Sequence, residues 1–259
     1  MKKKKVLLSI AGYDPTSGAG VLLDIQTFVQ MGFHGVGIVT ALTAQNTEHI
    51  RGTFFSPSDF LEEQYHVLSD DIEISGIKVG MLGCRENIPV IVQILSKNPE
   101  IPLVVDPIMK SSSGYWLLEK TNISAYTEAI GPKVSLLTPN LYEATLLSGI
   151  DIKTINDMKK AAESVFNTIN TPCLVTGGHL KDFPTDVLYD GKKHTLFENE
   201  KIERSVHGTG CFLSSSILGY LVLGHSIRRA CRLGVQDTTD AIKKAVPIGH
   251  GQHIIKFGL

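Results

Sequence analysis

Short apolar runs alternate along this chain with longer amphipathic segments, and the alternation constrains the fold more than any other feature. Several runs are apolar throughout, which is typical of strands buried on both faces of a sheet. The runs are Val6–Ala11, Val36–Leu42, Gly76–Met81, Leu103–Asp106, Ser135–Thr138 and Cys173–Thr176. The segments with helical spacing are Gly20–Met31, Ser58–Leu68, Glu86–Ser96, Thr121–Ile130 and Ile155–Phe166. This order predicts an α/β fold, with a mostly parallel sheet covered on both faces.

The pattern changes after Gly178. Asp186–Tyr189 and Lys193–Phe197 flank an Asp-Gly turn and predict a hairpin. Two helices are expected after it, at about Thr209–Leu223 and Ile227–Val246. Since no linker or repeat divides the 259 residues, we predict one domain, 1–259.

Composition excludes several function classes. The net charge of −1 gives no electrostatic reason to expect nucleic acid or an anionic membrane as a partner. The four cysteines are scattered without a C-x-x-C pair, which fits neither a disulfide framework nor a zinc site but does fit a reducing compartment. No run is long enough to span a membrane. We therefore expect a cytoplasmic protein.

The segments that carry chemistry all follow predicted strands. In parallel sheets, ligands bind in the crevice at the carboxyl ends of the strands. Six segments fall there: Gly12–Gly20, Thr43–Thr47, Met81–Gly83, Asp106–Gly114, Asn140–Glu143 and Gly177–His179. Their convergence indicates one ligand site at this edge.

The run from His207 to Cys211 (His-Gly-Thr-Gly-Cys) opens an apolar helix. Its glycines let backbone N–H groups turn toward one point at the positive end of the helix dipole, which makes an anion hole for a phosphoryl group. At such a position the pKa of the Cys211 thiol is expected to fall, so that the thiolate could take a substrate proton. The alternative is a glycine-rich turn with a buried, inert cysteine.

Two further segments offer acidic and amide groups. Asn140 and Glu143 read either as a plain capping box or as a cap whose carboxylate also holds Mg²⁺, with Asp106 as the second carboxylate. Gln45 follows a strand, where its amide could pair with the edge of a heterocycle or simply satisfy a turn. Asp24 lies one turn after Gly20.

Together these segments resemble the hydroxymethylpyrimidine/phosphomethylpyrimidine kinases of thiamine biosynthesis. The matching stretches, in the family's order, are Ser9–Pro15, Gly18–Gly20, Thr40–Thr47, Lys78–Leu82, Val105–Met109, Thr138–Glu143, Gly177–Leu180 and His207–Cys211. The run ending Ala-Gln-Asn-Thr at Thr47 is highly specific.

The resemblance implies a three-layer α/β/α ribokinase-like fold, often a homodimer, using ATP and Mg²⁺ on a small heterocyclic alcohol. It implies substrate binding by Gly12, Asp24, Gln45 and Met81. The ATP side would include Asp106, Asn140, Glu143, Thr176, Gly178 and His207, with Asp106 and Glu143 at the metal. Catalysis would fall to Cys211 with Gly208, Thr209 and Gly210.

Departures from the family pattern keep alternatives open. The family commonly has lysines where this chain has Ser112 and Thr176, and a small hydroxyl residue at Tyr13. The missing cations leave the second phosphorylation, that of the monophosphate, undecided. A pyridoxine/pyridoxal kinase is the second function that we consider. The alternative from a different functional class is a catalytically weak pyrimidine-binding paralogue.

Overall fold

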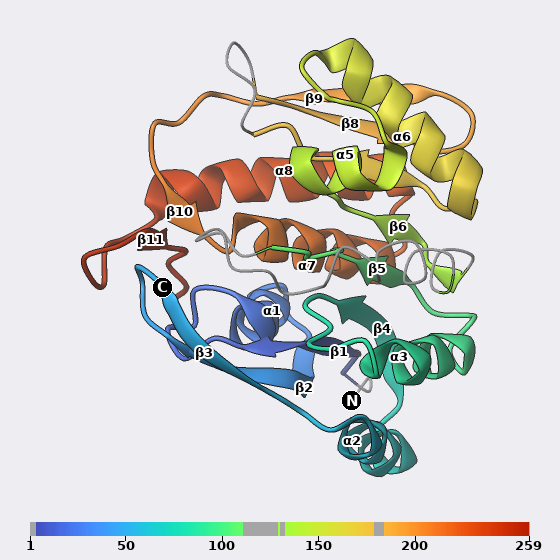
Figure 1. The fold of residues 1–259 in the computed structure, drawn as a ribbon, viewed down its shortest axis with the longest axis vertical. Helices are drawn as coiled ribbons and strands as arrows, with labels where there is room; N and C mark the ends of the chain where they lie inside the picture. Colours follow the sequence, from blue (N-terminus) through green and yellow to red (C-terminus); the bar gives the residue numbers. More distant parts are fainter. Residues whose placement is uncertain (1–3, 111–128, 130–132, 179–183, 259) are drawn as a thin grey trace.

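A nine-stranded sheet forms the middle layer of the computed structural model, which describes residues 4–110, 129, 133–178 and 184–258. Within these ranges the strand order is β3-β2-β1-β4-β5-β6-β7-β8-β9, and it follows the long axis of the molecule in Figure 1. The strands are β1 Val6–Tyr13, β2 His34–Gln45, β3 Ile50–Phe55, β4 Ile74–Val79, β5 Leu103–Val105, β6 Leu136–Leu137, β7 Cys173–Val175, β8 Thr185–Tyr189 and β9 His194–Glu198.

The strands that lie between β2 and β7 in the sheet, in the order β2-β1-β4-β5-β6-β7, are parallel to one another. Strands β3, β8 and β9 run antiparallel to their neighbours. All six strands predicted from apolar runs are present, and so is the hairpin, as β8 and β9. Strand β3 was not predicted. It is an edge strand with no fully buried residue, so it lacks the apolar signature that marks the others.

Helices cover both faces of the sheet, as the strand–helix alternation predicts. One face carries α1 Gly20–Gln30, α7 Thr209–Val222 and α8 Ile227–Lys244, and the other carries α2 Ser58–Asp71, α3 Asn87–Ser96, α5 Leu141–Ser148 and α6 Ile155–Ile169. The predicted helix Thr121–Ile130 falls almost entirely outside the described residues. Two apolar cores result, one per face: Leu7 of β1 packs toward α7, and Leu8 and Ile10 pack toward α2 and α3.

Strand β1 is the point at which the strand order reverses, since β2 and β4 pair with its two sides. Ligands of such sheets bind at the carboxyl end of this switch point. A short parallel ladder of β10 (Val206–His207) and β11 (His253–Ile254) lies there and leads directly into α7. The topology therefore brings the start of α7 to the carboxyl edge of β1.

Candidate active site

The start of α7 has the backbone geometry of an anion hole. Gly208 precedes the helix with a φ of +77°, and a Cβ atom built there would lie 1.9 Å from the carbonyl oxygen of Gly18. Only glycine fits this close approach. Within the described residues no side chain caps this helix, so first-turn N–H groups of Thr209 and Gly210 remain for a ligand.

Cys211 lies in the first turn of α7 but is not an exposed thiol. It is 6% exposed, and burial raises the pKa of the thiol to about 12, although the charge of Lys78 acts in the opposite direction. The prediction of a lowered pKa was therefore wrong. The desolvation that burial imposes on the thiolate outweighs the effect of the helix dipole.

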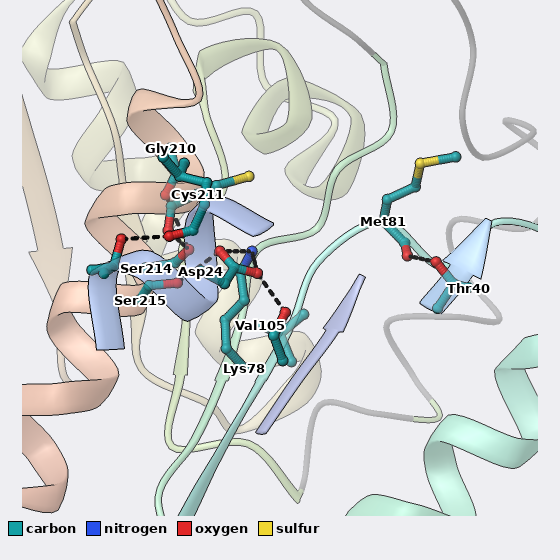
Figure 2. A network of polar contacts seen from close by, with 12 residues as sticks. Asp24, Thr40, Lys78, Met81, Val105, Gly210, Cys211, Ser214 and Ser215 are labelled. Atoms are coloured by element: carbon teal, nitrogen blue, oxygen red, sulfur yellow. Dashed lines mark hydrogen bonds and ion pairs between the residues drawn. The ribbon is translucent and has the colours of Figure 1, made fainter. Parts of the chain in front are cut away.

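A buried ion pair lies beneath this turn (Figure 2). The Nζ atom of Lys78 on β4 is 2.9 and 3.0 Å from the two carboxylate oxygens of Asp24 on α1, and both side chains have zero exposure. The hydroxyls of Ser9 and Ser215 donate to the same carboxylate at 2.6 and 2.8 Å. Burial opposes the charge of Lys78, but Asp24 raises the pKa of Lys78 above its usual value.

This arrangement gives Asp24 a structural role, and its role in substrate binding stays a prediction. Its two oxygens together accept four hydrogen bonds from inside the protein, and none of its surface reaches solvent. Asp24 joins the sheet to α7 through Lys78 and Ser215. A buried charge needs such a partner set to be tolerated.

Asp106 directly follows β5, and Glu143 lies in the first turn of α5, the helix that follows β6. A Cβ atom built at Gly210 would be 3.7 Å from Oδ2 of Asp106, so this carboxylate faces the first turn of α7. Burial raises the pKa of Asp106, against the charge of Lys78, and burial together with the charge of Asp106 raises that of Glu143.

Glu143 forms the capping box that the sequence predicts for α5. Its Oε2 accepts from the backbone N–H of Asn140 at 2.9 Å, and its own N–H donates to the Asn140 side chain at 3.0 Å. The other oxygen, Oε1, accepts from the backbone of Met109 at 3.3 Å. The predicted capping box is confirmed, and a role of Glu143 in metal binding stays a prediction.

The loop after β7 adjoins Asn140. Thr176 pairs with Asn140 in an isolated β-bridge, and a Cβ atom built at exposed Gly178 would meet no atom of the described residues within 4 Å. The N–H of Gly177 donates to Oδ1 of buried Asp186 at 2.8 Å, and Asn199 donates to the other oxygen at 3.2 Å. Asp186 therefore holds this loop in place. Ser112 and His179 lie outside the described residues.

Gly12, Gln45 and Met81, which are expected around the substrate, lie toward the carboxyl ends of β1, β2 and β4. A Cβ atom at Gly12 would lie 2.8 Å from Sδ of Met81, whose carbonyl accepts from Thr40 at 2.6 Å (Figure 2). The Gln45 amide lies 3.2 Å from Nε2 of His207, which is also 3.0 Å from Oδ2 of Asp14. His207, predicted on the ATP side, thus contacts the residue expected to bind the pyrimidine.

Lys78 and Asp14 were missed as site residues. The sequence did contain a signal for Lys78, because this lysine interrupts an apolar strand and Asp24 interrupts an apolar helix face. Two opposite charges at positions expected to be buried predict that they pair with each other. Asp14 gave no such signal, because an Asp-Pro pair in a loop reads equally well as a turn.

Two surface grooves lie away from this edge. One, of about 420 Å³, runs between β9 and α8 beside Arg232 and Asp240. The other, of about 480 Å³, lies along α2 beside Phe60 and Val67. Neither contains a residue of the carboxyl edge, where the functional motifs meet. The candidate site is therefore placed by those motifs.

A helix start able to bind an anion, beside two carboxylates at the switch point of this sheet, defines a small-molecule phosphotransferase with a ribokinase-like fold. The family model for phosphomethylpyrimidine kinase matches residues 14–256. The chain belongs to this phosphomethylpyrimidine kinase family.

Individual relatives agree with the family match. The chain is 36% identical to the hydroxymethylpyrimidine/phosphomethylpyrimidine kinase of Aquifex aeolicus, over 97% of this chain and 100% of that one. Among solved structures, phosphomethylpyrimidine kinase from Clostridium difficile is 34% identical with a TM-score of 0.81, covering 92% of this chain and 100% of that chain. Pyridoxal kinase from Staphylococcus aureus, solved with ADP, is 29% identical with a TM-score of 0.90, covering 98% and 93%.

Proposed function

We propose that this protein transfers the γ-phosphoryl group of ATP to the hydroxymethyl group of 4-amino-5-hydroxymethyl-2-methylpyrimidine, a step of thiamine biosynthesis. One observation carries the proposal: the start of α7 adjoins two different groups of residues. His207, just before the helix, contacts Gln45 on the substrate side, and Gly210 faces Asp106 on the nucleotide side. The N–H groups between them are suited to a phosphoryl group in transit.

The acidic residues suit a magnesium ion that arrives with the nucleotide. Mg²⁺ is commonly held by one or two carboxylates together with phosphates and water, rather than by a complete protein cage. Within the described ranges no group of three or more His, Cys, Asp or Glu residues could hold a metal. Asp106 and Glu143 fit this limited donor set and would hold the ion, which neutralises phosphate charge when bound.

In this proposal the protein acts mainly by positioning and by electrostatics. Phosphoryl transfer passes through a loose transition state that needs little proton abstraction early in the reaction. Cys211 keeps its proton at neutral pH, because burial holds the pKa of the thiol near 12. We therefore assign Cys211 to the wall of the anion hole rather than to the role of base.

A pyridoxal kinase is the second candidate. The Staphylococcus aureus pyridoxal kinase has also been solved with AMP-PCP and pyridoxal, with a TM-score of 0.89 to this chain. Phosphorylation of the pyrimidine monophosphate remains a further candidate step. Thr176, beside Asn140, provides no positive charge for a second phosphate.

We also propose a homodimer. Leu42 and Phe54 pair across β2 and β3, and they are 47% and 66% exposed. An apolar pair on an edge hairpin is a typical surface for a second copy of the chain. Sedimentation of the purified protein tests this, and a monomer at 50 times the assay concentration would contradict it.

Among the described residues, no helix is long and apolar enough to cross a membrane.

The function is tested by ³¹P NMR after incubation with Mg-ATP and the hydroxymethylpyrimidine. We expect a phosphomonoester signal that grows with time, with ADP in equal amount. ATP consumption without a phosphorylated pyrimidine would contradict the proposal. The same mixture with the monophosphate in place of the alcohol reports on the second step.

A further inference from the structure

The Gln45 amide lies between the side chains of His207 and Thr43. The other hydrogen-bond partners of these two side chains determine where their protons lie. On one side, Nε2 of His207 is 3.2 Å from the nitrogen position of the amide and 3.0 Å from Oδ2 of Asp14. On the other side, Oγ1 of Thr43 is 3.2 Å from the oxygen position of the amide and 3.0 Å from the carbonyl oxygen of Tyr13. Rotating the amide by 180° exchanges its two positions, so the protons of these neighbours decide which atom occupies which.

The His207 side requires an acceptor. A carboxylate only accepts, so the contact with Oδ2 of Asp14 needs a proton on Nε2 of His207. Burial acts to raise the pKa of Asp14, but hydrogen bonds from His207 and Thr16 hold it below its usual value, which keeps Asp14 ionised. With Nε2 protonated, the amide atom facing His207 must be the oxygen, which shares this single N–H with Oδ2 of Asp14.

The Thr43 side requires a donor. The Thr43 hydroxyl has one proton, and the carbonyl oxygen of Tyr13 can only accept it. Oγ1 of Thr43 then faces the amide with a lone pair. The amide nitrogen belongs on this side, and both ends of the amide are satisfied by the same orientation.

We propose that Asp14, acting through His207, and Tyr13, acting through Thr43, fix the orientation of the Gln45 carboxamide and with it the hydrogen-bonding preference of the substrate site. The amide then offers its donor on the Thr43 side and its acceptor on the His207 side. A ligand that pairs with both must present a ring nitrogen acceptor next to an amino donor, in that order. Asp14, His207 and Thr43 are positioning residues, and Gln45 determines specificity. This inference rests on the proposed function.

Two substrates distinguish the orientations. In the 4-aminopyrimidine the ring nitrogen accepts and the exocyclic amino group donates. In its pyrimidin-4-one analogue a carbonyl oxygen replaces the amino group and the adjacent ring nitrogen carries a proton, so the order is reversed. We expect wild-type kcat/KM to favour the amino compound by at least about 100-fold. Comparable values for the two compounds would overturn the inference.

Asp14→Asn is the principal variant. It keeps the size and an acceptor for Thr16, but lets position 14 donate to Nε2 of His207, which releases the amide to rotate. We expect the preference for the amino compound to fall by about tenfold or more, which is the value of one hydrogen bond. Thr16→Val is the matched control, since it removes a bond to the other oxygen of Asp14 and leaves Oδ2 facing His207. Its preference should stay within twofold of wild type.

Thr43→Val tests the other end of the amide, and it keeps the inference testable if Asp14→Asn does not fold. It should lower the preference in the same direction. Binding of both compounds, measured by calorimetry without nucleotide, should show the same changes as kcat/KM. If folded Asp14→Asn or Thr43→Val keeps the wild-type preference within twofold, the inference is wrong. If wild type phosphorylates neither compound, the proposed function itself fails.

Discussion

At the scale of single residues, the ion pair of Lys78 and Asp24 is the feature that we expect to tolerate substitution least. Both side chains are fully buried, so Lys78→Met leaves the Asp24 carboxylate without its cation. We expect a loss of about 3–5 kcal/mol in the free energy of unfolding, measured by urea denaturation, and a recovery of most of it in Lys78→Met/Asp24→Leu. Lys153→Met, which breaks the exposed pair with Asp151, should change nothing measurable. An equally mild effect of Lys78→Met would contradict this account.

Cys211 gives the second prediction at this scale. Because its pKa lies near 12, the thiol carries its proton at pH 7.5, where only a thiolate reacts readily. Iodoacetamide should label the half-buried Cys84 well before Cys211, as followed by mass spectrometry of the peptides. In Cys211→Ala the pH dependence of kcat should keep its shape between pH 6 and 9. Rapid labelling of Cys211 at pH 7.5 would restore it as a candidate base.

At the scale of elements, the start of α7 depends on Gly208. Gly208 and Gly224 both have positive φ values, +77° and +90°, so alanine costs about 1–2 kcal/mol of backbone strain at either. Only at Gly208 would the new Cβ meet backbone, 1.9 Å from Gly18, whereas Gly224 has open space. Gly208→Ala should lower kcat at least about 100-fold, as loss of an oxyanion-hole donor does, while Gly224→Ala keeps near-normal kcat. Equal kcat values for the two variants would show that this turn is not the anion hole.

Asp186 makes the loop after β7 sensitive to pH. Burial raises its pKa from 3.8 to about 6, against hydrogen bonds from Gly177 and Asn199. The folded state therefore binds the proton more tightly than the unfolded state, and stability contributed by this group falls as pH rises from about 4 to about 6, by about 3 kcal/mol. Asp186→Asn removes this loss, so its stability relative to wild type should improve across that window in denaturant titrations. A difference independent of pH would contradict the buried, ionising carboxyl.

At the scale of the whole molecule, the sheet and its helices followed from local pattern because β1, β4 and β5 are mostly apolar and are buried at nearly every position. Strand β3 was not predicted, since an exposed edge strand has no buried face to constrain its residues. In the site, the capping box of Asn140 and Glu143 was predictable from neighbours in sequence. The burial of Asp24 and Cys211, and the contact of His207 with Gln45, depend on residues far apart in the chain, which no local pattern specifies.

The prediction of one domain also belongs to this scale. The sheet is continuous from β3 to β9 within the described residues. Thermal unfolding followed by calorimetry and by circular dichroism should then give one shared transition. Two separable transitions would indicate independent units instead.

The most direct test of the central claim is a competition assay. The purified protein is given Mg-ATP with equal concentrations of the hydroxymethylpyrimidine and pyridoxal, and both phosphorylated products are quantified by mass spectrometry at early times. The ratio of the two rates equals the ratio of kcat/KM values. We predict that the phosphorylated pyrimidine forms faster. Pyridoxal phosphate forming faster, or neither product forming, would contradict the assignment.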